Sequence, residues 1–210
     1  GKLAVTATDC DIETILTVDS DAELAPVCVP PYLLEAAGGL KSASVDIEID
    51  DQQAVFKSGR ARFAAPILPG VDFPVFAPKF DSSFAIAGSA LAGLFHATRD
   101  AVEAPGGHRY YLEGVYLEIG DGRLYAVATN GHRLHTTSVE APDGAKLPSG
   151  EGIIVPAKAC VEIIRLAGEA AEQPVTVEMS RNMIAVSAGA ERITSKLIEG
   201  TFPDWKRVLP

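Results

Sequence analysis

The stretch Leu124–Leu134 reads LYAVATNGHRL, a strand-like run that ends in a polar turn, and the sequence contains a second version of it. The earlier version, LAVTATDCDI, occupies Leu3–Ile12. Two further phrases recur in the same order: VPPYLLEAAGGL and VPAKACVEIIRLAG, then KSGRARFAAPILPGVDFP and SAGAERITSKLIEGTFPDW. Three matching phrases in matching order predict a fold built from two similar units. Each unit reads as a strand, a short helix and further strands.

The second copy shows the helical and strand periodicities most clearly. Apolar residues spaced i, i+3, i+4 and i+7 predict one face of a helix: Cys160, Ile163, Ile164 and Ala167. The opposite face carries charged residues: Lys158, Glu162, Arg165 and Glu169. Residues 175–179 and 45–49 alternate apolar and polar side chains, as half-buried strands do. Polar turns follow both runs and predict hairpins.

Residues 84–118, between the two copies, predict another strand and helix. The helix has an apolar face composed of Leu91, Leu94, Phe95, Thr98 and Val102. The EAPGGH loop ends this helix because glycine and proline are poor helix formers. A Gly-Asp-Gly turn then joins two predicted strands. The order of these elements predicts an α+β fold made of repeated β-α-β-β-β units.

The composition is that of an ordinary globular chain, long enough for one large domain or up to two ordinary ones. The chain has 210 residues, 47% hydrophobic and 22% charged, with a net charge of −10. Such a charge argues against nucleic acid unless a few cations gather on one face. No apolar run reaches the roughly 18 residues of a membrane span and no signal peptide pattern opens the sequence, so we expect a soluble, cytoplasmic protein.

The three cysteines, Cys10, Cys28 and Cys160, are odd in number and lack the spacing of a metal site. Free cysteine is among the most buried residue types. We therefore expect buried, reduced thiols.

Several phrases of the sequence resemble one bacterial protein family. They are ATDCDIE, SGRARF followed by LPGVDFP, RYYLEGVYLE, VATNGHRL, IIVPAKA and TSKLIEGTFPDWKRVLP. The family is the β subunit of DNA polymerase III, the bacterial sliding clamp, and the last four phrases are the most specific. The resemblance implies the DNA-clamp fold, with helices on one face of antiparallel sheets.

The resemblance also implies a domain organisation. Residues 1–76 correspond to the later part of clamp domain one and residues 77–205 to clamp domain two. Residues 206–210 correspond to the start of a linker toward a third domain that this sequence lacks. The chain is then either an excerpt of a longer clamp or an unusually short relative.

In that family two crescent subunits close into a homodimeric ring around duplex DNA, with helices lining the hole. DNA polymerase and clamp-loader proteins bind a groove on each subunit through short peptide motifs. The resemblance implies a non-enzymatic processivity factor for DNA replication, without a cofactor, that holds DNA independently of sequence through weak phosphate contacts. The alternative is a clamp-like protein-interaction module that binds partner peptides without encircling DNA.

The resemblance assigns the peptide groove to the Gly-His-Arg-Leu turn, the leucine after the Tyr-Tyr pair, and the end of the chain. The residues carried over are Leu112, Thr129, Gly131, His132, Arg133, Leu134, Pro203, Arg207 and Val208. Their apolar members offer surface to the hydrophobic anchors of a peptide, and the arginines can bond its backbone or acidic groups. Arg109 is a lesser candidate at the edge. Asn130 stands where the family usually has Asp, a change that can keep the turn.

The DNA-facing candidates are cations on the predicted helices: Arg99, Lys158 and Arg165, with His96 as a weaker fourth. A solvated helix surface is an equally good interpretation, because Glu162 and Glu169 could pair with the cations of their helix. Two departures from the family weaken the DNA hypothesis. The helix in PYLLEAAGGL carries no cation, and Ala157 stands where the family commonly has one.

The resemblance further implies subunit-interface roles for Arg60 and Arg62, two apart on one predicted strand. In the family the corresponding positions form salt bridges to the third domain of the next subunit. A solvated edge strand is an equally good interpretation for this chain.

The sequence offers weaker support for two other functions, catalysis and metal binding. His132 could act as a general base, but no serine or cysteine motif accompanies it. Asp9, Asp11 and Glu13 alternate along a predicted strand and could hold a divalent ion on one face. A solvated acidic face is the favoured interpretation. We therefore predict neither a catalytic residue nor a metal site.

Overall fold

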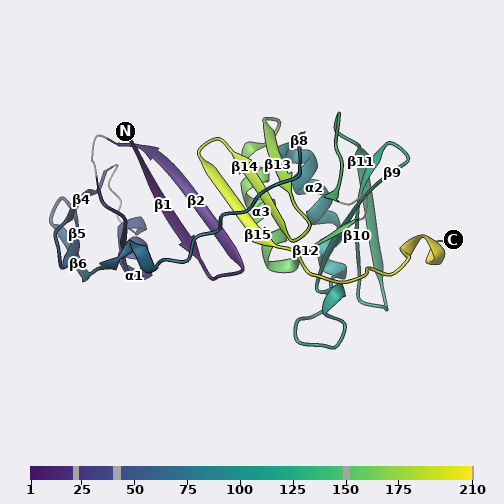
Figure 1. Cartoon of the computed structure of the whole chain (residues 1–210), viewed down its shortest axis with the longest axis horizontal. Coiled ribbons are helices and arrows are strands. Elements are labelled where there is room, and N and C mark those ends of the chain that lie inside the picture. Colours follow the sequence, from purple (N-terminus) through teal and green to yellow (C-terminus); the bar gives the residue numbers. More distant parts are fainter. Residues whose placement is uncertain (21–23, 40–43, 149–151, 210) are drawn as a thin grey trace. The chain divides into compact units, whose positions relative to one another are not determined.

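The computed structural model describes residues 1–20, 24–39, 44–148 and 152–209 (Figure 1). The chain divides into two compact units. The smaller contains Asp21–Pro74 with Gly1, and the larger combines Lys2–Ser20 with Val75–Pro210. Leu40 in the first predicted helix phrase and Pro210 in the predicted linker lie outside the described residues.

The smaller unit has one short helix and a three-stranded antiparallel sheet. Its elements are β3 (Val27–Cys28), α1 (Pro31–Gly38), β4 (Asp46–Ile49), β5 (Gln53–Ser58), β6 (Ala61–Pro66), β7 (Leu68–Pro69) and the 3₁₀ helix η1 (Gly70–Asp72). Leu33 of the helix shares a core cluster with Phe56 and Ala65 of the sheet. The predicted helix and hairpin of the first copy are therefore confirmed.

Two expectations for the smaller unit were wrong. Arg60 lies in the turn between β5 and β6, next to Gly59 with its φ of 58°, so it does not share a strand with Arg62. Arg62 lies on β6 and is exposed. Ile47 was expected on a half-buried strand, but on the edge strand β4 it is 43% exposed.

The larger unit contains two antiparallel sheets. The six-stranded sheet has the order β1-β2-β15-β14-β13-β8. Its strands are β1 (Lys2–Thr8), β2 (Ile12–Asp19), β8 (Ser82–Ala87), β13 (Pro174–Met179), β14 (Met183–Ala188) and β15 (Glu191–Lys196). The four-stranded sheet has the order β11-β10-β9-β12. Its strands are β9 (Gly114–Gly120), β10 (Arg123–Thr129), β11 (Leu134–Glu140) and β12 (Ile153–Pro156).

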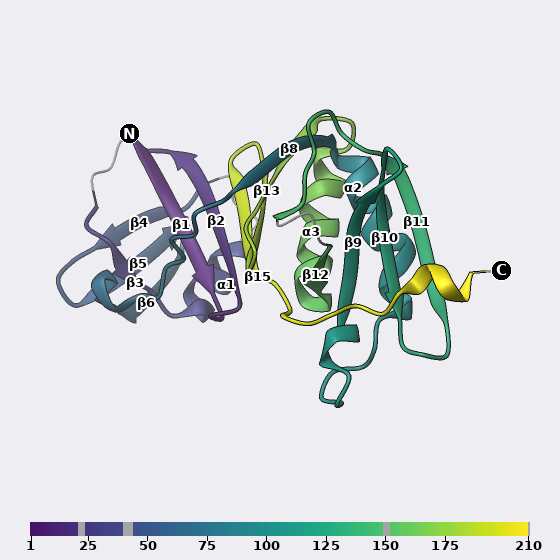
Figure 2. The same cartoon turned by 45° about the vertical axis from the view of Figure 1, so that its right-hand side comes forward.

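Two helices, α2 (Gly88–Thr98) and α3 (Ala157–Ala170), lie between these sheets in both views (Figures 1 and 2). The predicted apolar face of α2 is buried from Leu91 to Thr98, and Phe95 is fully enclosed. On α3, Ile163 is buried as predicted. One core cluster joins both helices to both sheets, which confirms the α+β class and the packing of helices on sheet faces. No helix in the described ranges is long and apolar enough to cross a membrane.

A tight turn explains the hairpin of β9 and β10. Between β9 and β10, Asp121 and Gly122 both have positive φ, 51° and 71°, as a two-residue hairpin turn of the primed type requires.

The hairpin of β1 and β2 belongs to the larger unit, because β2 pairs with β15. The assignment of residues 1–76 and 77–205 to two clamp domains remains a prediction.

The three cysteines differ in how deeply they are buried. Cys160 is buried on α3, and burial raises the pKa of its thiol to about 12. Cys28 is half-buried, whereas Cys10 is exposed in the turn after β1 with a φ of 72°. The expectation of buried thiols holds for Cys160 and is wrong for Cys10.

Candidate functional site

The turn between β10 and β11 is held rigid by its own side chains. The Asn130 carboxamide oxygen accepts the backbone N–H groups of His132 and Arg133, both at 3.1 Å. The Thr129 hydroxyl donates to the Arg133 carbonyl at 2.8 Å and accepts the Gly131 N–H at 3.1 Å. Asn130 thus performs the turn-forming role available to Asp. The side chains of His132 and Arg133 are left exposed.

Gly131 is favoured at its position by its backbone conformation. Its φ is 81°, a conformation that side chains with a Cβ rarely adopt. A Cβ built there would lie 2.6 Å from a guanidinium nitrogen at the flexible end of the Arg109 side chain, which would have to move. Arg109 itself forms an ion pair with Glu103. The 3₁₀ helix η3 (Tyr110–Leu112) follows directly, so the segment that carries Leu112 adjoins the turn.

An apolar cluster lies beneath these segments. Its buried members are Leu112, Val127, Ile154, Phe202 and Trp205, and its half-buried members are Tyr111, Tyr116, Tyr125, Leu134 and Ile198. Two predicted groove residues, Leu112 and Leu134, therefore belong to one cluster. Leu112 is only 3% exposed, so it packs inside the cluster and offers little surface of its own to a ligand.

The segment after β15 crosses this cluster and ends in the 3₁₀ helix η5 (Trp205–Val208). The rings of Phe202 and Tyr116 stack with their centroids 4.6 Å apart. The indole N–H of Trp205 donates to a Glu118 carboxylate oxygen at 3.0 Å. Lys206 donates to the other oxygen of Glu118. Ring stacking and these two hydrogen bonds fix the segment to β9.

The carboxylate of Glu118 has a perturbed pKa. Burial raises this pKa, but the hydrogen bonds from Lys206 and Trp205 and the positive charge of Lys206 outweigh burial and hold it below the usual range. The pKa of the Lys206 ammonium is raised, chiefly by its hydrogen bond to Glu118. Glu118 is therefore ionised at neutral pH and holds η5 in place.

The remaining predicted groove residues are exposed on this anchored segment. Pro203 follows the buried Phe202, and Arg207 lies within 3.7 Å of the Asp204 carboxylate. Val208 is 70% exposed, although its side chain is apolar. The structure brings Leu112 and Leu134 into one cluster and presents Pro203, Arg207 and Val208 on the segment anchored to it.

The aromatic anchors Phe202 and Trp205 were missed by the sequence prediction. Phe202 precedes the 3₁₀ helix that begins at Trp205, so no helical periodicity relates the two residues, and the only signal in the sequence was the presence of two large aromatic side chains in a short polar segment. A hollow of about 400 Å³ lies beside the cluster and is lined by Ile154 and Ile198 among others. No predicted groove residue lines this hollow, and it carries no assignment.

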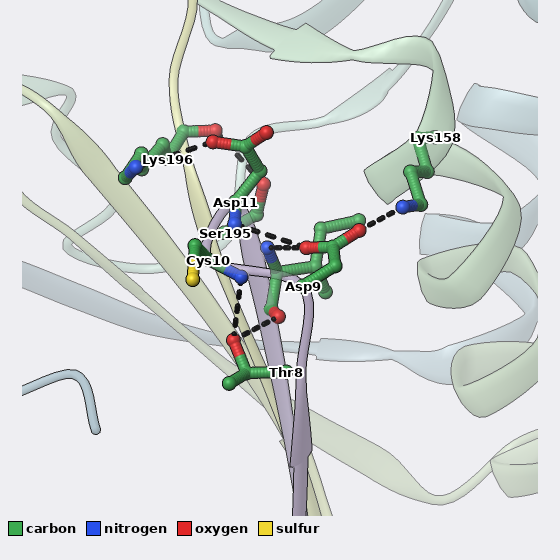
Figure 3. A network of polar contacts seen from close by, with 8 residues as sticks. Thr8, Asp9, Cys10, Asp11, Lys158, Ser195 and Lys196 are labelled. Atoms are coloured by element: carbon green, nitrogen blue, oxygen red, sulfur yellow. Dashed lines mark hydrogen bonds and ion pairs between the residues drawn. The ribbon is translucent and has the colours of Figure 1, made fainter. Parts of the chain in front are cut away.

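The cations predicted to face DNA all have carboxylate partners. Lys158 pairs with Asp9 (Figure 3). Arg99 lies 3.6 Å from Asp100. Arg165 contacts three carboxylates: Glu162 at 3.3 Å, Glu169 at 3.5 Å, and Glu191. Hydrogen bonding to Glu191 raises the pKa of Arg165, so its charge is permanent. His96, the weaker candidate, is exposed on α2.

The metal alternative at the start of the chain was wrong. Asp9 and Asp11 lie in the turn before β2, and Glu13 lies on β2, so the three do not alternate along one strand. Glu13 is 3% exposed and accepts the Phe76 N–H at 2.8 Å, which also contradicts a solvated acidic face. Among the described residues, no group of three or more His, Cys, Asp and Glu could hold a metal ion.

The turn at residues 129–134 and the segment at 202–208 thus lie over one apolar cluster, on a fold of two antiparallel sheets with helices between them. The family described as DNA polymerase III beta subunit, central domain, matches residues 86–204, and the chain belongs to this family. Its members are non-enzymatic processivity factors, so a catalytic role for His132 is set aside.

Individual relatives agree with this assignment. The chain is 36% identical to the beta sliding clamp of Caulobacter vibrioides and 33% identical to that of Escherichia coli strain K12. All of this chain is covered, but only 58% and 57% of those proteins. A solved sliding clamp from Bartonella birtlesii bound to griselimycin has a TM-score of 0.90 at 36% identity and matches over 57% of its length. The chain therefore spans little more than half the length of the relatives it matches.

Proposed function

We propose that this chain contributes the partner-binding groove of a bacterial sliding clamp. The full-length protein would form a homodimeric ring around duplex DNA in the cytoplasm and tether the replicative DNA polymerase. DNA polymerase and clamp-loader proteins would bind the groove through short peptide motifs. One observation carries the proposal: the turn at residues 129–134 and the segment at 202–208 both adjoin the apolar cluster of Leu112 and Trp205.

The geometry suits an extended peptide with apolar anchors. Leu134 is half-buried and Val208 exposed, so both can add contact area when a peptide side chain covers them. Arg133 stands at the turn, where its guanidinium can donate to a peptide carbonyl or carboxylate. Because the turn is already fixed by Thr129 and Asn130, little conformational entropy is lost there on binding.

Peptide titration with matched variants tests this proposal. A fluorescent peptide with two apolar anchors and an acidic residue is added to the wild type, to Leu134→Ala and to Lys158→Ala, and its anisotropy is recorded. We expect Leu134→Ala to weaken binding by about fivefold to tenfold. Lys158→Ala should leave the affinity unchanged, because Lys158 pairs with Asp9 and belongs to the DNA-facing set. Equal losses in both variants would contradict the separation of the two surfaces.

A second candidate is a protein-interaction module that binds peptides without encircling DNA. It is favoured by the ion pairing of Arg99, Lys158 and Arg165 with carboxylates of the same chain. Loading of the full-length gene product onto nicked circular DNA distinguishes the candidates. Retention on circles and release from linearised DNA supports the ring. Peptide binding without retention supports the adaptor.

The subunit-interface role of Arg60 and Arg62 is likewise a proposal. Arg62 is exposed on β6, and Arg60 is exposed in the preceding turn. Both guanidinium groups are therefore accessible to carboxylates of a second subunit. A double substitution of both arginines by alanine should weaken the dimer of the full-length protein, as measured by analytical ultracentrifugation.

A further inference from the structure

The turn between β1 and β2 is organised by its own polar side chains (Figure 3). The Thr8 hydroxyl donates to the Ile12 carbonyl at 2.8 Å and accepts the Cys10 N–H at 3.0 Å. One carboxylate oxygen of Asp9, Oδ1, accepts the N–H groups of Asp11 at 2.9 Å and Ile12 at 2.8 Å. The turn therefore needs Oδ1 of Asp9 as an acceptor, whether or not that residue is charged.

The second oxygen of Asp9 has a different role. Oδ2 pairs with the ammonium group of Lys158, in the first turn of α3 (Figure 3). The two residues are 149 positions apart in the sequence. The pair remains accessible to solvent, since the Lys158 side chain is 67% exposed and that of Asp9 is 39% exposed. An ion pair this exposed is weak and can exchange its partner.

The same turn holds a second pair, which serves as an internal comparison. Asp11 Oδ1 lies 3.1 Å from the ammonium of Lys196 at the end of β15. Both pairs use a carboxylate of one turn and an exposed lysine. Only Lys158 lies on the helix face that the proposed function directs toward DNA.

We propose that Asp9 is a positioning residue that sets the strength of DNA contact by competing with phosphates for Lys158. This inference rests on the proposed function. A DNA phosphate that binds the Lys158 ammonium competes for it with the Asp9 carboxylate, and the negative charge of that carboxylate repels the phosphate. The exchange leaves little net gain in free energy, so the contact stays weak and reversible. Weak phosphate contacts are what a protein that moves along DNA requires.

The substitution Asp9→Asn separates the two roles of Asp9. An asparagine Oδ1 can still accept both turn N–H groups, whereas the negative charge facing Lys158 is removed. Asp11→Asn is the matched control, because it removes the same charge from the same turn but releases Lys196. Asp9→Ser, whose hydroxyl can also accept a turn N–H, serves as a second variant should Asp9→Asn unfold.

The test measures anisotropy of a fluorescent mixed-sequence duplex with the wild type, Asp9→Asn, Asp11→Asn, Lys158→Ala and the double variant Asp9→Asn/Lys158→Ala. We expect Asp9→Asn to tighten binding by about twofold to fivefold. We expect the slope of log K against log salt to steepen by up to about one. Asp11→Asn should give less than half of that gain, and the gain should vanish in the double variant. A change that merely altered folding would not follow Lys158 in this way.

Three results would overturn the inference. Equal gains from Asp9→Asn and Asp11→Asn would mean that net charge alone controls DNA binding. A Lys158-dependent affinity that does not respond to Asp9→Asn would overturn the inference and leave the proposed function intact. Peptide binding by a protein that binds DNA in no variant would remove the DNA part of the proposed function, and the inference with it.

Discussion

The turn of the proposed groove and the exposed face of α3 differ in whether their cations already have carboxylate partners. Among the described residues, no carboxylate lies within ion-pair distance of Arg133 at the groove turn. On α3, Lys158 and Arg165 are both paired with carboxylates of the same chain. The contrast is confined to the turn, because Arg207 on the neighbouring segment lies 3.7 Å from Asp204. Arg133 can therefore meet a partner without giving up an ion pair, whereas Lys158 and Arg165 already have carboxylate partners that compete with any ligand. This difference predicts specific, largely apolar binding at one surface and weak, salt-sensitive binding at the other.

The largest effect is expected from removing the aromatic anchor of the groove. Trp205→Ala should lower the free energy of unfolding by about 3–5 kcal/mol, because it deletes a buried ring and leaves a cavity. Peptide affinity should fall by more than about tenfold as the segment at 202–208 detaches. Urea unfolding and peptide anisotropy measure the two effects.

Trp205→Phe is the control for that change, since it keeps most of the buried ring but loses the hydrogen bond to Glu118. It should cost less than half as much stability as Trp205→Ala. Unchanged peptide binding in Trp205→Ala would show that η5 does not form part of the groove.

The next effect concerns the rigidity of the groove turn. Asn130→Ala removes the acceptor of two backbone N–H groups and should cost about 1–2 kcal/mol of stability. Peptide affinity should fall by about threefold to tenfold, because the turn must then be ordered on binding. Asn130→Asp should retain both properties. If Asn130→Ala bound as tightly as the wild type, preorganisation of the turn would be irrelevant.

A smaller effect is expected from acid. A carboxyl group whose folded-state pKa lies below its unfolded value stabilises the fold above the unfolded pKa, and that contribution is lost as the pH falls through the folded pKa. For Glu118 the ordinary value is 4.5, so docking of η5 should weaken below that pH. The contribution is about 1 kcal/mol.

The fluorescence of Trp205, the single tryptophan of the chain, reports this docking. The wild type should show a transition in emission as the pH falls below 4.5, the ordinary pKa of the glutamate carboxyl group. Glu118→Gln should show no such transition. An identical acid profile in both proteins would assign the change to other carboxyl groups.

The smallest effect is expected on the helix face. Arg165→Gln breaks an exposed network with Glu162, Glu169 and Glu191, yet it should change the stability by less than about 1 kcal/mol, because surface ion pairs contribute little. Raising the salt concentration should reduce even this difference. Thermal unfolding of both proteins at low and high salt measures it. A loss comparable to that of Asn130→Ala would mean that these charges hold the fold together.

Local patterns were sufficient to predict much of the fold. The spacing of Leu91, Leu94 and Phe95 fixed one face of α2, and the Gly-Asp-Gly turn fixed the β9–β10 hairpin. Both depend on residues close in sequence, where backbone periodicity and turn geometry decide the outcome. The alternation of Asp9, Asp11 and Glu13 was misread as a continuous strand. The first strand ends at Thr8 and a turn follows, so these three side chains do not share one face.

The site was predictable only in part. The motif resemblance identified Leu112 and Leu134, and the structure joins them in one cluster. It did not indicate the ion pair of Asp9 with Lys158, because such a contact depends on the pairing of β2 with β15. Nor did it indicate that Glu118 would receive both Trp205 and Lys206. Contacts between distant positions follow from the assembled fold and leave no periodic trace in the sequence.

Hydrogen–deuterium exchange with and without a bound partner peptide tests the central claim, that the groove binds partners, most directly. The account predicts slower exchange at residues 129–134 and 202–208, where a bound peptide would cover the turn and the anchored segment, and no change on α3. Protection on α3, or protection that leaves both groove segments unchanged, would contradict it.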